Sequence, residues 1–267
     1  MQLTIGDVRL AVLDEGTGTA IVLLHGFPLA KETWDRQAAA LARVARVIRF
    51  DLRGLGASAV TEGPTLMELL AGDVAGVLDA LSVERAVIVG HSLGAYVTFA
   101  FFRMFAERCL GLGIVCSRAV ADTDDAIAQR HALAERVERE GLQPVVDWYL
   151  PKYFAPEMYE RAPETVQRVR EIIERSDPRG VIAMLRGMAA RVSSEDLFCE
   201  IDVPLRVVAG LQDEIAPIAF ARRIAREVRS AKLDVLDCGH FPLLEVPDAL
   251  TASLEQLLSL AEAPHTF

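Results

Sequence analysis

The chain is poor in the residues that cross-link proteins or hold metals. Its 267 residues include four cysteines, and no two of them form a C-x-x-C pair. We therefore expect buried, reduced thiols rather than a disulfide framework or a zinc site. No H-E-x-x-H, EF-hand or P-loop pattern is present either. The sequence accordingly predicts a protein that uses no metal and no cofactor.

Long apolar runs and positive charge are also scarce. No apolar run approaches the ~20 residues that cross a bilayer, so we expect no membrane association. The 28 basic residues are outnumbered by 38 acidic ones, which gives a net charge of −10. Because no basic stripe is available to neutralise phosphates, nucleic-acid binding is disfavoured. Residues 1–16 alternate like a strand hairpin and lack the features of a signal peptide, which predicts a cytoplasmic protein.

What is present is an alternation of strand-like and helical segments. Short apolar runs predict strands, and apolar residues at helical spacing predict helices between them. Such alternation is typical of the α/β class, a mostly parallel sheet with helices on both faces. The expected strands cover 20–27, 46–51, 86–90, 111–117, 204–210 and 231–239. Helices are expected over 31–43 and 65–81, the second with an apolar stripe of Leu66, Leu69, Leu70, Val74, Val77, Leu78 and Leu81.

The alternation stops between residues 118 and 196, where helical patterns follow one another. We expect 118–196 to form a cap inserted into an α/β core made of residues 1–117 and 197–267. A cap at this place would cover the carboxyl edge of the sheet, where open α/β sheets bind ligands. A helical layer without a gating role is the alternative. The acidic run D-T-D-D at 122–125 is expected to be an exposed cap of the first inserted helix rather than a metal site.

The segment Gly90-His91-Ser92-Leu93-Gly94 fits the pattern G-x-S-x-G between a predicted strand and a predicted helix. A strand that turns directly into a helix makes a tight elbow, and its central side chain projects outward. The flanking glycines remove Cβ atoms that would clash there. Free N–H groups at the start of a helix favour negative charge. The pattern therefore predicts that Ser92 is a nucleophile and that the Leu93 N–H receives an oxyanion.

A serine hydroxyl needs a base to become a nucleophile, and the base needs an acid that orients it. Among five histidines, His240 lies just past the last predicted strand, on the same sheet edge as Ser92. Asp213 follows the preceding strand and completes G-x-x-D-x-x-x-P with Pro217, which favours it over Glu214. The chain order Ser92, Asp213, His240 is typical of α/β-hydrolases.

Four motifs together resemble the α/β-hydrolase superfamily, in particular its serine-esterase and cofactor-free haloperoxidase-like branch. Besides the elbow, His25-Gly26-Phe27-Pro28 is similar to the oxyanion-loop motif of that family. The segment 51–58, D-L-R-G-L-G-A-S, resembles its D-x-R-G-x-G-x-S motif, and 239–247 resembles the segment around its histidine. The resemblance spans essentially the whole chain, and the insertion lies where the family carries its cap. It implies the α/β-hydrolase fold.

The resemblance also implies roles for the oxyanion loop. The Phe27 N–H would be the second donor to an oxyanion, and the Phe27 ring would line the substrate pocket, whereas His25 would be structural. Trp148 in the inserted segment is a further candidate for the pocket wall. The other apolar candidates for this wall are Tyr149, Phe154, Met184 and Met188.

One competing signal is set aside. Residues 54–59 formally fit the dinucleotide fingerprint G-x-G-x-x-A, which should open a helix. The turn pair Gly63-Pro64 follows instead, so we reject binding of NAD or FAD.

These features predict a cofactor-independent serine hydrolase that cleaves a small-molecule carboxylic ester through an acyl-enzyme. The same residues would serve a cofactor-free haloperoxidase or perhydrolase, an enol-lactonase or a carbon–carbon bond hydrolase. A ligand sensor built on a hydrolase fold is the alternative from a different class, because fold does not dictate function. The sequence leaves the acyl and alcohol groups and the oligomeric state open.

Overall fold

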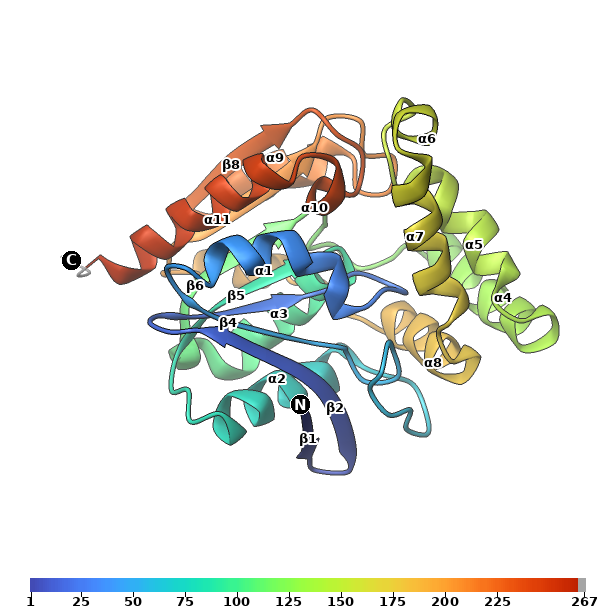
Figure 1. The fold of residues 1–267 in the computed structure, drawn as a ribbon, viewed down its shortest axis with the longest axis horizontal. Coiled ribbons are helices and arrows are strands. Elements are labelled where there is room, and N and C mark those ends of the chain that lie inside the picture. Colours follow the sequence, from blue (N-terminus) through green and yellow to red (C-terminus); the bar gives the residue numbers. More distant parts are fainter. Residues whose placement is uncertain (264–267) are drawn as a thin grey trace.

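A computed structural model describes residues 1–263 and contains one eight-stranded sheet. The strand order is β1-β2-β4-β3-β5-β6-β7-β8. The first two strands form an antiparallel hairpin, β2 runs antiparallel to β4, and all neighbours from β4 to β8 are parallel (Figure 1). This mostly parallel sheet confirms the predicted α/β class. The strands are β1 (Gln2–Ile5), β2 (Val8–Gly16), β3 (Ala20–Leu24), β4 (Arg46–Phe50), β5 (Ala86–His91), β6 (Cys109–Val115), β7 (Leu205–Gly210) and β8 (Ala231–Leu236).

Helices cover both faces of the sheet. On one face α1 and α11 pack against each other, and on the other α2 packs against α3, which lies across the central strands (Figure 1). The strands β3, β5 and β7 are buried along their whole length, as their continuous apolar sequences require. The helices outside the segment between β6 and β7 are α1 (Asp35–Leu41), preceded by the 3₁₀ turn η1 (Lys31–Trp34), α2 (Met67–Ala80), α3 (Leu93–Phe105), α9 (Ile218–Glu227), α10 (Pro242–Glu245) and α11 (Pro247–Glu262).

The apolar stripe expected on the helix at 65–81 is wrong at its beginning. Leu66 and Leu69 are 41% and 40% exposed, whereas Leu70 is fully buried. Leu66 has an extended backbone and precedes the first turn of α2, so it is not on the helix at all. Leu69 lies one residue off the stripe that begins at Leu70 and continues at i+4, i+7 and i+8.

Five helices lie between β6 and β7 and form a layer at one end of the sheet (Figure 1). Within it α4 packs against α8 and α5, and α5 also contacts α7. The helices are α4 (Asp124–Glu140), α5 (Gln143–Tyr149), α6 (Met158–Arg161), α7 (Pro163–Glu174) and α8 (Pro178–Ala189), with the 3₁₀ turn η3 (Leu150–Lys152) after α5. None of the helices within residues 1–263 has the length and apolar character needed to cross a membrane.

The acidic run at the start of α4 only partly follows the expectation of an exposed cap. The helix is capped by Thr123, whose hydroxyl accepts the Ala126 N–H, and Asp124 and Asp125 are exposed. Asp122, however, has a fully buried side chain that is paired with arginines. The expectation fails there because Asp122 is enclosed by Arg118 and Arg130, its neighbours in sequence, together with Arg191, which comes from the distant end of α8.

Candidate active site

The elbow between β5 and α3 places Ser92 in a strained conformation. Its φ of 52° and ψ of −111° lie in a region that residues with a side chain rarely adopt. A Cβ on Gly90 would lie 2.1 Å from the backbone of Gly94, and a Cβ on Gly94 would lie 2.3 Å from the Leu24 carbonyl oxygen. Both glycines are therefore required for the strand to turn into the helix at this point. The Ser92 N–H donates to the Val115 carbonyl at 2.9 Å, which holds the elbow on the neighbouring strand.

Three side chains from three different loops meet at the end of the sheet. His240 Nε2 lies 2.9 Å from Ser92 Oγ, and His240 Nδ1 lies 2.8 Å from Asp213 Oδ2. His240 and Asp213 are 1% and 6% exposed, so this chain of hydrogen bonds is shielded from water. The structure thus brings together all three side chains that the sequence singled out, in the order hydroxyl, imidazole, carboxylate.

Asp213 is held as a carboxylate. Its other oxygen accepts the N–H groups of Ile215 and Ala216, both at 2.8 Å. Burial by itself would raise the pKa of Asp213, but the adjacent His240 ring and these two N–H groups outweigh burial and lower it. An ionised carboxylate at Nδ1 favours the histidine tautomer with its proton on Nδ1. Nε2 is then free to accept the proton of Ser92.

Two backbone N–H groups next to the serine are free to bind a ligand. Within residues 1–263, neither the Phe27 N–H nor the Leu93 N–H has a hydrogen-bond acceptor. Leu93 is the first residue of α3, where the N–H groups of a helix have no intrahelical partner. The loop that carries Phe27 lies directly against the elbow, because a Cβ on Gly26 would be 2.8 Å from His91 Nδ1. The two donors therefore flank the same site.

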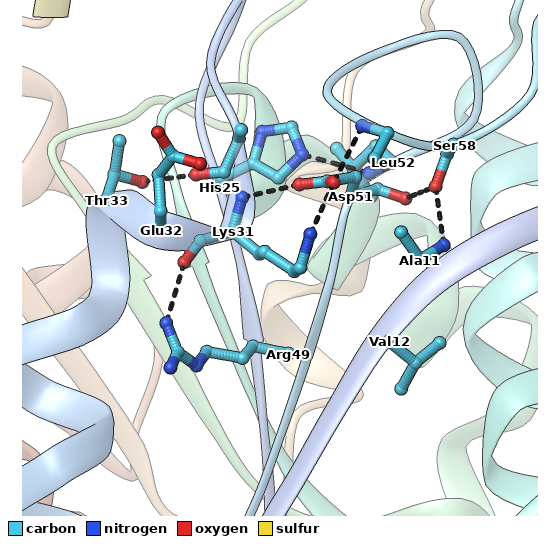
Figure 2. Close-up of polar contacts among 12 residues, drawn as sticks. Ala11, Val12, His25, Lys31, Glu32, Thr33, Arg49, Asp51, Leu52 and Ser58 are labelled. Carbon is cyan, nitrogen blue, oxygen red and sulfur yellow. Dashed lines mark hydrogen bonds and ion pairs between the residues drawn. The ribbon is translucent and has the colours of Figure 1, made fainter. Parts of the chain in front are cut away.

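His25 fastens this loop to the next strand end, as expected for a structural residue. Its Nε2 accepts the Leu52 N–H at 2.9 Å (Figure 2). This leaves the proton on Nδ1 to donate to the Gly26 carbonyl at 2.8 Å. Burial lowers the pKa of His25, so the ring stays neutral. His25 is consequently occupied on both nitrogens and has no nitrogen left for a ligand.

Asp51 fixes the segment that follows the same loop. One of its oxygens accepts the Lys31 N–H at 2.7 Å, and the other lies 2.6 Å from Lys31 Nζ and accepts the Ala57 N–H at 2.8 Å (Figure 2). Gly56 is needed beside it, because a Cβ there would lie 2.3 Å from the Asp51 carboxyl carbon. The D-x-R-G-x-G-x-S segment therefore acts as an anchor for the loops around the site.

Glu245 positions the loop of His240, a role that the sequence reasoning missed. Its carboxylate accepts the N–H groups of Gly239 at 3.1 Å and Phe241 at 3.2 Å, on either side of His240, and the Ala155 N–H at 2.9 Å. The only signal was its place in the 239–247 motif, since acceptance of backbone N–H groups leaves no pattern in a sequence. Glu245 thus connects the histidine loop to the inserted helices.

His91 supports the same loop from the other side. Its Nε2 donates to the His240 carbonyl at 2.8 Å, and its ring centroid lies 5.0 Å from that of His240. Full burial, reinforced by the neighbouring His240, lowers the pKa of His91 to about 3. The ring therefore stays neutral, because burial penalises a charge there more than the nearby Asp213 favours one.

Two adjoining cavities lie between these loops and the inserted helices. An inner pocket of about 30 Å³ is lined by Ser92, His240 and Phe27, and an outer cavity of about 420 Å³ opens beyond it. Trp148 is 44% exposed and lines only the outer cavity. Of the other wall candidates, Tyr149 and Met188 line the inner pocket, whereas Phe154 and Met184 are buried in the packing. The pocket residues that the sequence did not single out are Tyr96, Arg118, Arg130, Tyr153 and Ile215.

Comparisons with known proteins agree with this geometry. Residues 21–253 match the alpha/beta hydrolase family, and the chain belongs to that family. Its structure is similar to a thermophilic esterase from Thermogutta terrifontis, with a TM-score of 0.95, 34% identity and coverage of 98% of this chain and 99% of the other. It is also similar to the enol-lactonase from Burkholderia xenovorans LB400, with a TM-score of 0.91, 27% identity and coverage of 97% and 100%. The 3-oxoadipate enol-lactonase 2 of Acinetobacter baylyi is 26% identical over 96% of this chain and 95% of its own length.

Proposed function

We propose that this hydrolase cleaves carboxylic esters, with Ser92 as nucleophile, His240 as general base and acid, and Asp213 as the acid that orients the histidine. The observation that carries the proposal is the continuous hydrogen-bond chain from Ser92 Oγ through the His240 ring to Asp213, at 2.9 and 2.8 Å. The Ser92 end of this chain lies in the inner pocket, next to the free N–H groups of Phe27 and Leu93. Acyl transfer requires this arrangement of a nucleophile, a base and two oxyanion donors. The similarity to an esterase at 34% identity over almost the whole chain supports the reaction class.

The reaction follows from the roles of these groups. Ser92 Oγ attacks the acyl carbon while His240 Nε2 takes its proton, and the carbonyl oxygen becomes an oxyanion between the Phe27 and Leu93 N–H groups. Each such donor contributes about 3 kcal/mol to the transition state. His240 then protonates the departing alcohol, which leaves an acyl-enzyme on Ser92. A water molecule that loses its proton to His240 attacks the acyl carbon, and Ser92 recovers its proton as the acid leaves.

We further propose that residues 118–196 act as a cap on a core of residues 1–117 and 197–267. The Tyr153 hydroxyl donates to the Phe27 carbonyl, and the Ala155 N–H donates to Glu245. Through these two bonds the inserted segment is fastened to the oxyanion loop and to the histidine loop. The helix α8 is seated closely on the core, since a Cβ on Gly180 would lie 1.8 Å from the Gly54 carbonyl oxygen. Substrate therefore enters along α4 and α5, where the outer cavity lies.

Hydrolysis of a lactone is the second candidate function. Two enol-lactonases match this chain over nearly its whole length, at 26% and 27% identity. The chemistry at Ser92 is the same for both candidates, except that the leaving alcohol of a lactone stays tethered to the acyl group. Turnover of open-chain esters alone supports the first candidate, and preference for lactones at equal concentration supports the second.

The test is an assay of p-nitrophenyl esters of graded acyl length, run beside a lactone series. We expect turnover by the native protein and a loss of at least about 10³-fold in kcat for Ser92→Ala, since the nucleophile is absent. Ser259→Ala, which changes an exposed serine on α11, is the matched control and should keep full activity. Full activity in Ser92→Ala, or no turnover of any ester or lactone by the native protein, would overturn the proposal. Tight ligand binding without turnover would favour a sensor.

A further inference from the structure

Three arginines surround one buried aspartate beside the inner pocket. Asp122 lies 2.9 Å from Arg118 Nη2, 2.5 Å from Arg130 Nε and 3.0 Å from Arg191 Nη1. The Asp122 side chain is fully buried, and the three arginine side chains are 22%, 12% and 3% exposed, respectively. We call these four residues the arginine cluster. It contains three positive charges and one negative charge, so two positive charges are left without an anion in a place where burial penalises them.

The excess charge faces the cavities. Arg118 and Arg130 are in the wall of both the inner pocket that contains Ser92 and the outer cavity. Arg136 and Lys152 add positive charge to the outer cavity, and Glu214 is the acidic residue in its wall. The chain as a whole carries a net charge of −10, so this gathering of positive charge opposes the average of the molecule. An anionic ligand would be drawn toward the pocket and retained there.

The other contacts of the arginine cluster leave a donor without an acceptor. Arg130 Nη1 donates weakly to the Tyr149 hydroxyl at 3.3 Å, and the Arg191 guanidinium stacks on the Tyr96 ring at 4.1 Å. Arg118 Nε is buried and has no hydrogen-bond partner among residues 1–263. A buried donor left without a partner is unfavourable, and a guanidinium fork suits a planar oxyanion.

We propose that the substrate carries a carboxylate in addition to its ester or lactone group, and that Arg118 and Arg130 bind this carboxylate while the carbonyl lies at Ser92. This inference rests on the proposed function. The carboxylate would neutralise part of the excess charge and accept the free Arg118 Nε–H, while Arg191 adds charge from behind. Because the same two arginines line the small inner pocket, the carboxylate and the reacting carbonyl are separated by only a few bonds.

The test compares anionic esters with neutral isosteres in which an isopropyl group replaces the carboxylate. Monoethyl succinate is paired with ethyl 4-methylpentanoate for a carboxylate on the acyl side, and acetoxyacetate with isobutyl acetate for one on the alcohol side. In the native protein we expect kcat/KM for at least one anionic ester to exceed that of its isostere at least tenfold. Equal or lower values in both pairs overturn the proposal while leaving ester hydrolysis intact.

Variants assign the preference to the arginine cluster. Arg118→Gln should lower the anionic-to-neutral ratio of kcat/KM at least tenfold, chiefly through KM of the anionic ester, and Arg118→Lys should restore part of it. Arg170→Gln removes a half-buried cation on α7 that pairs with Glu174 and lines neither cavity, so it should leave the ratio unchanged. A ratio that Arg118→Gln does not alter overturns the assignment.

Binding separates this inference from the proposed function. Calorimetric titration of Ser92→Ala with the same four esters needs no turnover, so it gives an answer even if the native protein hydrolyses none of them. We expect an anionic ester to bind at least tenfold more tightly than its isostere, and the difference to vanish in Ser92→Ala combined with Arg118→Gln. If that double variant does not fold, Arg118→Lys on the same background replaces it. Equal affinities overturn the inference.

Discussion

At the scale of single residues, the site depends on groups that are held in one protonation state. Asp213 stays ionised because its two N–H donors and the His240 ring lower its pKa against the effect of burial. His91 stays neutral because burial lowers its pKa to about 3. Asp213 is charged and His91 is neutral, and each holds His240: Asp213 binds the ring and His91 binds the carbonyl. The position of His240 therefore depends on pH through the protonation states of Asp213 and His91.

His91 predicts a loss of stability in acid. Between pH 6.5 and about 3 the unfolded chain binds a proton at residue 91 and the native protein does not. Stability therefore falls as pH falls through this window, by at most about 1.4 kcal/mol per pH unit from this residue. In His91→Gln, which keeps a donor for the His240 carbonyl, the free energy of unfolding should vary less with pH.

The measurement is urea unfolding of both proteins at pH 7, 6, 5 and 4.5. The slope of unfolding free energy against pH is the readout, because the substitution also changes stability itself. His131→Gln, which alters an exposed histidine on α4, is the control and should keep the native slope. A native slope in His91→Gln would show that this histidine is not kept neutral by the fold.

At the scale of elements, the site is assembled by loops that are tied to one another rather than by any single helix or strand. Glu245 in α10 holds the backbone on both sides of His240 and also the Ala155 N–H of the inserted segment. The His25 ring joins the oxyanion loop to the end of β4 through the Leu52 N–H. Burial raises the pKa of Glu245, and the three backbone N–H donors oppose this effect by stabilising the carboxylate.

Glu245→Gln tests this positioning role. The amide keeps the shape but replaces one acceptor oxygen by a donor, so one of the three backbone N–H groups loses its partner. We expect kcat to fall about tenfold with KM little changed, and the free energy of unfolding to fall by about 1–3 kcal/mol. Steady-state kinetics and urea unfolding provide both numbers.

Glu255→Gln, at an exposed position on α11, is the control and should match the native protein in both measurements. A Glu245→Gln variant that loses stability but keeps the native kcat would mean that the residue supports the fold without positioning His240.

At the scale of the whole molecule, local patterns predicted the framework and long-range contacts decided the rest. The strands, the elbow at Ser92 and the placement of Asp213 and His240 follow from short motifs at strand ends, because parallel strands bring those ends to one edge. The complete arginine cluster could not be predicted, since Arg191 meets Asp122 only after α4 and α8 have packed together, although Arg118 and Arg130 are close to Asp122 in sequence. The exposure of Leu66 and Leu69 depended likewise on where α2 begins and which face it buries.

The most direct test of the central claim is reaction with a fluorophosphonate followed by mass spectrometry of the intact protein and of its peptides. If Ser92 is activated by His240 and Asp213, one phosphonyl group is added per chain, it maps to Ser92, and ester hydrolysis disappears in proportion to labelling. Hydrolysis that persists in fully labelled protein, or an adduct that forms at another serine while Ser92 stays unmodified, would contradict the account.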